Sequence, residues 1–134
     1  MSAEMDKAVF AHGQQPGSLE LAFVGDSVYE LFVRKHLALR GGRARALSDQ
    51  AVAKVNAGAQ ARSLEKRMPF LTEEEQAVVR RAHNVKQTPP KHADPAAYRS
   101  ATALEALLGY LYLTDQRGRL NELLRLAAEM EGEL

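Results

Sequence analysis

Two acidic residues of this chain stand in stretches that are otherwise strongly apolar. Asp26 follows Gly25 inside the apolar run 18–33, and Glu105 lies inside the apolar run 101–112. Asp is among the residues least often fully buried, and Gly in a helix interior costs about 0.5–1 kcal/mol relative to Ala. Stability alone would favour neither residue in the middle of the first run. We therefore expect the two carboxylates to serve chemistry rather than packing.

Two carboxylates from different helices can hold one hard cation. Mg²⁺ prefers oxygen ligands, keeps several waters and usually takes one or two protein carboxylates. Such an ion can polarise a phosphodiester, lower the pKa of a bound water and stabilise charge on the leaving oxygen. Asp26 and Glu105 are therefore candidate ligands for Mg²⁺. The alternative for each acid, taken singly, is a satisfied polar residue at a helix break or a surface edge.

A basic stretch lies between the two acids in the sequence. The whole chain carries a net charge of only +1, but residues 80–99 hold five basic residues against Asp94 alone, a local net charge of +4. His83 and His92 lie in the same stretch. A local basic stretch is typical of a surface that binds a polyanion, and its alternative is an ordinary solvated face. The five basic residues are Arg80, Arg81, Lys86, Lys91 and Arg99.

The composition sets the class of protein. The 134 residues are 46% apolar, which suits one domain with its own core. There is no cysteine, so a disulfide framework and a thiolate metal site are excluded. No apolar run has the length of a membrane span, and residues 1–17 lack the apolar segment of a signal peptide. We expect a cytoplasmic protein with a loosely held arm over residues 1–17 and a single domain over residues 18–134.

The elements that must position the acids are expected to be helices. Ser18 and Thr72 are predicted N-caps, and Thr72 forms a capping-box pattern with Glu75. Residues 87–95 are predicted to form a loop, because they contain three prolines and proline breaks a helix interior. No segment alternates with period two for long enough to be a strand, so the predicted class is all-α. The predicted helices cover residues 18–39, 43–66, 73–86, 95–113 and 119–131.

The predicted helix over residues 18–39 is apolar on more than one face. Its apolar positions follow a helical period, but Leu21, Val24 and Val33 widen the stripe. A helix that is apolar nearly all round is buried on more than one side. In a small domain this indicates either a central helix or a subunit interface.

Four blocks of the sequence resemble the ribonuclease III family when taken in order. The residues FVGDSV over 23–28 are similar to the core of that family's signature, and LEALLGYLYL over 104–113 is similar to its second acidic helix. With RRAHNVK over 80–86 and PKHAD over 90–94, followed by Tyr98 and Arg99, the chain resembles the Mini-III branch, which lacks a double-stranded-RNA-binding domain. The resemblance spans roughly residues 18–113.

The resemblance implies an all-helical, homodimeric, Mg²⁺-dependent endoribonuclease that acts on double-stranded RNA. Asp26 and Glu105 match the family's catalytic, metal-binding acids. Two further acids of full-length ribonuclease III correspond here to Ala22 and Thr102, as in the Mini-III branch. That branch matures the precursor of large-subunit ribosomal RNA, which is the expected substrate, with a ribosomal protein as a possible partner.

RNA contacts are expected from the basic stretch. A-form RNA hides its base edges, so recognition goes through shape, phosphates and 2′-hydroxyls. The expected contact residues are Arg80, Arg81, His83, Asn84, Lys86, Lys91, His92 and Arg99.

Two other functions compete with this interpretation. A non-catalytic RNA-binding or ribosome-associated protein could use the same fold, but it would have no need of Asp26 and Glu105, and both are present. A DNA-binding helix-turn-helix domain needs a compact helix pair with a tight turn. The proline-rich loop over residues 87–95 argues against it.

Overall fold

The computed structural model describes residues 15–41, 43 and 57–127, and this part of the chain is helical without a strand. The predicted all-α class is confirmed. None of the helices in these ranges combines the length and the apolarity that crossing a bilayer requires. The elements are α2 (Ser18–Arg40), α4 (Ala57–Arg67), the 3₁₀ helix η1 (Met68–Phe70), α5 (Glu73–Asn84), α6 (Pro95–Leu113) and α7 (Arg117–Ala127).

The helix boundaries follow local signals closely. Thr72 accepts a hydrogen bond from the backbone N–H of Glu75, while the Glu75 side chain accepts one from the Thr72 N–H, so the predicted capping box is present. Asp94 caps α6 by accepting from the N–H of Ala96, with Pro95 in the first turn. Gly41 ends α2 with a positive φ of 87°, a conformation that favours glycine.

Two of the predicted helix boundaries are wrong, and several predicted segments lie outside the residues that the structure describes. The N-cap of α2 is Gly17 without a side-chain bond, rather than Ser18, which is already helical. Helix α7 begins two residues earlier than predicted, at Arg117. Most of the predicted helix over residues 43–66, the end of the last helix and the arm over residues 1–17 except 15–17 lie outside the described residues.

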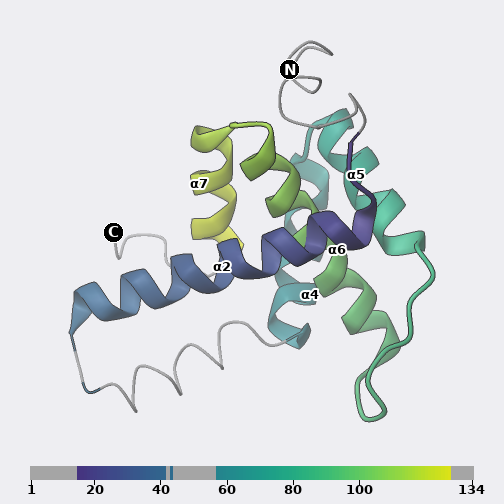
Figure 1. Ribbon diagram of the computed structural model, residues 1–134, viewed down its shortest axis with the longest axis horizontal. Coiled ribbons are helices and arrows are strands. Elements are labelled where there is room, and N and C mark those ends of the chain that lie inside the picture. The colour runs from purple at the N-terminus through teal and green to yellow at the C-terminus, as the bar shows by residue number, and fades with distance from the viewer. Residues whose placement is uncertain (1–14, 42, 44–56, 128–134) are drawn as a thin grey trace.

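Helix α6 is the centre of the packing. It contacts α2, α4, α5 and α7, and Figure 1 shows α2 running across it. Every residue of α6 from Ala101 to Leu111 is buried except Glu105, which is half-buried. The sequence left two positions open for the helix over residues 18–39, the centre of the domain or a subunit interface. The structure excludes the central position, because α6 occupies it.

Helix α2 buries one face and exposes apolar side chains on the other. Leu21, Tyr29 and Val33 belong to the core, whereas Phe23 is 81% exposed and Leu31 is 69% exposed. Of the residues predicted to widen the apolar stripe, Leu21 and Val33 thus lie in the core. Phe23 and Leu31 remain on the surface of the single chain.

Candidate active site

Helices α2 and α6 touch through their backbones at two glycines. An ideal Cβ on Gly25 would lie 1.7 Å from the carbonyl oxygen of Glu105. One on Gly109 would lie 2.0 Å from the carbonyl oxygen of Leu21. No side chain fits at either position, so the two helix axes come closer than they could if either residue carried a Cβ. Because Asp26 directly follows Gly25, the crossing places the Asp26 side chain next to that of Glu105.

The carboxyl groups of Asp26 and Glu105 meet at this crossing. Asp26 is exposed on α2, and Glu105 is half-buried on α6. Burial, then the hydrogen bond to Asp26 and the negative charge of Asp26, raise the pKa of Glu105 to about 8. At neutral pH the protonated Glu105 carboxyl donates to Asp26. The close pair therefore holds a proton that a bound cation would displace.

The donor set fits a hard divalent cation. Both side chains offer oxygen, and the pair opens to solvent on the Asp26 side. A magnesium ion usually takes one or two carboxylates and completes its shell with water. Among residues 15–41, 43 and 57–127 there is no cluster of three or more His, Asp or Glu that could hold a metal. The three histidines in these ranges, His36, His83 and His92, thus belong to no such cluster.

A glutamine that sequence reasoning missed lies beside Glu105. Gln60 on α4 is only 3% exposed. Its side chain reaches the Glu105 carboxyl and lowers the pKa of that group, against the larger effect of burial. The sequence did contain a signal, because Gln60 is the one large residue in the otherwise small run 57–61.

Four of the expected RNA-contact residues surround one hollow. His83 and Asn84 end α5, Lys86 follows, and Arg99 projects from the first turns of α6. Together with Val85 and Gln87 they line a hollow of about 370 Å³. The Gln87 carboxamide oxygen accepts a hydrogen bond of 3.2 Å from the Thr102 hydroxyl. Thr102 lies one turn before Glu105, so the hollow is tied to the helix that carries the acid.

The other four expected contacts lie outside that hollow. Arg80 and Arg81 are exposed on α5, where Arg80 donates to Gln76 at 2.9 Å and Arg81 donates to Gln15 at 3.0 Å. Lys91 and His92 are exposed in the turn of the loop that joins α5 to α6. The predicted basic surface therefore has a recessed part and an open part.

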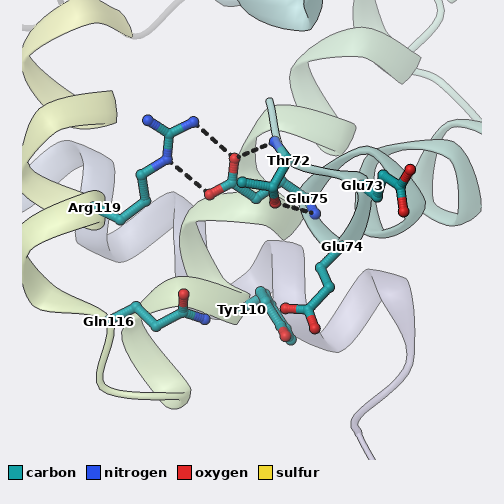
Figure 2. A pocket seen from close by; sticks show the side chains of 7 residues that line it. All are labelled: Thr72, Glu73, Glu74, Glu75, Tyr110, Gln116 and Arg119. Carbon is teal, nitrogen blue, oxygen red and sulfur yellow. Dashed lines mark hydrogen bonds and ion pairs between the residues drawn. The ribbon is translucent and has the colours of Figure 1, made fainter. Parts of the chain in front are cut away.

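A second charged site has a different character (Figure 2). Arg119 of α7 donates to both oxygens of Glu75, through Nε at 2.8 Å and Nη2 at 2.8 Å. Oε1 of Glu75 also accepts the backbone N–H of Thr72 at 2.9 Å. Burial pushes the pKa of Glu75 up, but the hydrogen bonds from Arg119 and Thr72 outweigh it and lower the pKa. Both oxygens are satisfied, so this site joins α7 to α5 and offers no open ligand position.

Comparisons with known proteins point to one family. The Ribonuclease III domain family matches residues 19–116. The Mini-ribonuclease 3 of Symbiobacterium thermophilum is 51% identical over 113 residues, which cover 83% of this chain and 87% of the relative. The Mini-ribonuclease 3 of Gloeobacter violaceus is 48% identical over 115 residues, covering 85% and 84%.

A more distant relative and a solved structure agree with these matches. The Mini-ribonuclease 3 of Enterococcus faecalis is 40% identical over 124 residues, covering 90% of this chain and 94% of the relative. The crystal structure of a protein from Fusobacterium nucleatum superposes with a TM-score of 0.81 at 35% identity, covering 90% of this chain and 97% of that one.

Proposed function

The chain belongs to the ribonuclease III family of endoribonucleases, and we propose that it cleaves double-stranded RNA with Mg²⁺ held by Asp26 and Glu105. The observation that carries this proposal is the meeting of the two carboxyls where α2 and α6 cross at Gly25 and Gly109. A fold that needed only stability would gain nothing from placing a second acid against a half-buried one.

The chain's own groups suit the cleavage of a phosphodiester. Asp26 faces solvent, where a phosphate of the substrate can approach. Glu105 is held between helices, and its proton leaves when the cation binds. Bound there, Mg²⁺ would polarise a phosphate oxygen and lower the pKa of a coordinated water. The partial burial of Glu105 strengthens its interaction with a cation, because less water screens the two charges.

RNA would be held by the basic surface, whose recessed part is linked to the helix of Glu105 through the Thr102–Gln87 hydrogen bond. Lys86 and Arg99 supply charge in the recessed part, while Asn84 and His83 supply hydrogen bonds to phosphates or 2′-hydroxyls. The open part adds charge on α5 and on the loop that follows it. Affinity from such contacts falls as salt rises, because each neutralised phosphate releases counterions. The residues of the open part are Arg80, Arg81, Lys91 and His92.

The active enzyme is proposed to be a homodimer formed by the exposed face of α2. Phe23, Leu31 and Tyr112 are large, apolar and exposed. They line a mainly apolar hollow of about 540 Å³ between α2 and α7. Contiguous exposed apolar surface of this kind marks an interaction site, and a twofold axis presents the same patch from both copies. The dimer would give one carboxylate pair to each RNA strand.

The proposed substrate is the precursor of large-subunit ribosomal RNA, cleaved in the cytoplasm. The support is the similarity to the Mini-ribonuclease 3 relatives over most of the chain. The described basic surface reads backbone and shape rather than base edges, so a ribosomal protein bound to the precursor would supply the missing selectivity.

The test compares a duplex RNA with its separated strands, each with Mg²⁺ or with EDTA. We expect cleavage of the duplex with Mg²⁺ alone, and none by the D26N variant. Binding of the duplex without cleavage would instead support the non-catalytic RNA-binding function. Cleavage of the single strands alone would contradict the proposed substrate class.

A further inference from the structure

Gln60 is a buried polar residue whose hydrogen bonding is incomplete. Its Nε2 atom is inaccessible to solvent and has no well-aligned acceptor within the described residues. A buried amide without a partner typically costs about 1–3 kcal/mol. A position that carries this cost in the core calls for a reason beyond packing.

The position of Gln60 supplies that reason. Helix α4 packs against α6, and the Gln60 side chain meets the carboxyl of Glu105. A carboxyl group has two oxygens, so one can bind a cation while the other accepts a hydrogen bond. Nε2 of Gln60 is a buried donor beside this carboxyl and has no well-aligned acceptor within the described residues. A Glu105 oxygen turned toward Nε2 would complete the hydrogen bonding of Gln60.

We propose that Gln60 is a positioning residue that donates a side-chain hydrogen bond to the Glu105 carboxylate in the metal-bound state. This inference rests on the proposed function, because it takes Glu105 as a metal ligand. The bond would fix the rotamer of Glu105 and direct one of its oxygens to the cation. Groups that orient a metal ligand in this way typically change metal affinity about 10- to 100-fold when removed.

The same helix provides a matched control. Ser63 lies three positions after Gln60, is also buried, and its hydroxyl also has no partner within the described ranges. It does not contribute to the pKa shift of Glu105. A general effect of buried polar groups on α4 would therefore act at both positions, whereas positioning of Glu105 would act only at Gln60.

The experiment measures Mn²⁺ binding by electron paramagnetic resonance without RNA, and the Mg²⁺ dependence of duplex cleavage. Q60M keeps the length of the side chain and removes the donor. We expect Q60M to weaken Mn²⁺ binding and to raise the half-saturating Mg²⁺ concentration, each about 10-fold or more. The KM for RNA at saturating Mg²⁺ should stay within about twofold, and S63A should match the wild type in all of these. Unchanged metal binding in folded Q60M, or an equal effect of S63A, would overturn the inference.

A measurement on the wild-type protein keeps the inference testable if Q60M fails to fold. With ¹⁵N-glutamine labelling, the side-chain amide of Gln60 should shift and exchange its protons more slowly when Mg²⁺ is added. An amide signal that does not respond to Mg²⁺ would count against the proposed bond. The E105Q variant distinguishes a failure of the proposed function from a failure of the inference about Gln60. If E105Q binds Mn²⁺ like the wild type, the proposed function fails; if only Gln60 has no effect, the proposed function stands.

Discussion

Glu75 and Glu105 are both withdrawn from water, and their surroundings drive their charges in opposite directions. Glu75 is 3% exposed and faces the guanidinium of Arg119, which keeps its pKa low. Glu105 is half-buried and faces another acid, which together with burial raises its pKa to about 8. The fold places the guanidinium of Arg119 against Glu75. It places no basic group of the described residues against Glu105. A carboxyl kept without its counter-charge is a place where an outside cation can bind.

The position of each residue within its helix adds to the difference. Glu75 lies in the first turn of α5, where backbone N–H groups are free, and it accepts the N–H of Thr72. Glu105 lies in the middle of α6, where the helix already uses every N–H. Helix ends satisfy acids locally, whereas a mid-helix acid depends on what other elements bring to it.

The largest expected effect is the difference in RNA-cleavage rate between variants of Glu105 and Glu75. E105Q should reduce Mg²⁺-dependent cleavage of duplex RNA by about three orders of magnitude or more, because loss of a metal ligand removes several kcal/mol of transition-state stabilisation. E75Q should cleave at close to the wild-type rate at a temperature where both variants are folded. Initial rates, corrected for the folded fraction by circular dichroism, give the comparison. Equal losses in the two variants would show that burial, rather than the missing cation, distinguishes these residues.

The next effect tests whether the glycine crossing is what holds Glu105 against Asp26. G109A should lower the free energy of unfolding by about 3 kcal/mol, because its Cβ would meet the backbone of Leu21. G118A is the control, since a Cβ there has no atom within 4 Å and Ala favours a helix. Urea unfolding of both variants measures the change. A G109A protein within about 1 kcal/mol of the wild type would mean that the helices can separate at little cost.

Removal of the built-in cation should give a smaller loss, confined to stability. R119M leaves Glu75 buried without its ion pair, so the free energy of unfolding should fall by about 2–3 kcal/mol. R117M removes the exposed pair with Asp115, and its effect should be about 0.5 kcal/mol or less. Thermal and urea unfolding of the two variants test this. If the two losses are equal, the Glu75 pair is no more important than a surface pair.

The two glutamates should also give opposite pH dependences of stability in EDTA. The folded pKa of Glu105 is raised above the ordinary 4.5, so its contribution is fully present below pH 4.5 and is lost as pH rises through about 8. The folded pKa of Glu75 is lowered, so its contribution is present above pH 4.5 and is lost as pH falls. Urea midpoints from pH 4 to 9 should therefore lose their alkaline decline in E105Q and part of their acid decline in E75Q. An alkaline decline that persists in E105Q would contradict the raised pKa.

Features that depend on neighbours within one helical turn could be predicted from the sequence. The capping box at Thr72 and Glu75 and the span of α6 from Pro95 to Leu113 follow from such local signals, and the structure has both. The exception is the start of α2, where Gly17 takes the cap position although Ser18 carries the better capping side chain. Each carboxylate of the candidate site could be singled out because an acid within an apolar run is unusual, whichever face of the helix it occupies.

The partner of each buried acid was decided by the tertiary structure alone. Residues 75 and 119 are 44 positions apart, and nothing local assigns the arginine of α7 to that glutamate. The backbone contact at Gly25 and Gly109, and the approach of Gln60, likewise join segments far apart in the chain. The sequence by itself determined which acids are out of place, because the cost of an acid in an apolar run is local. Only the packing of α2, α4 and α7 around α6 decided which acid received a cation from the fold and which was left open to bind one.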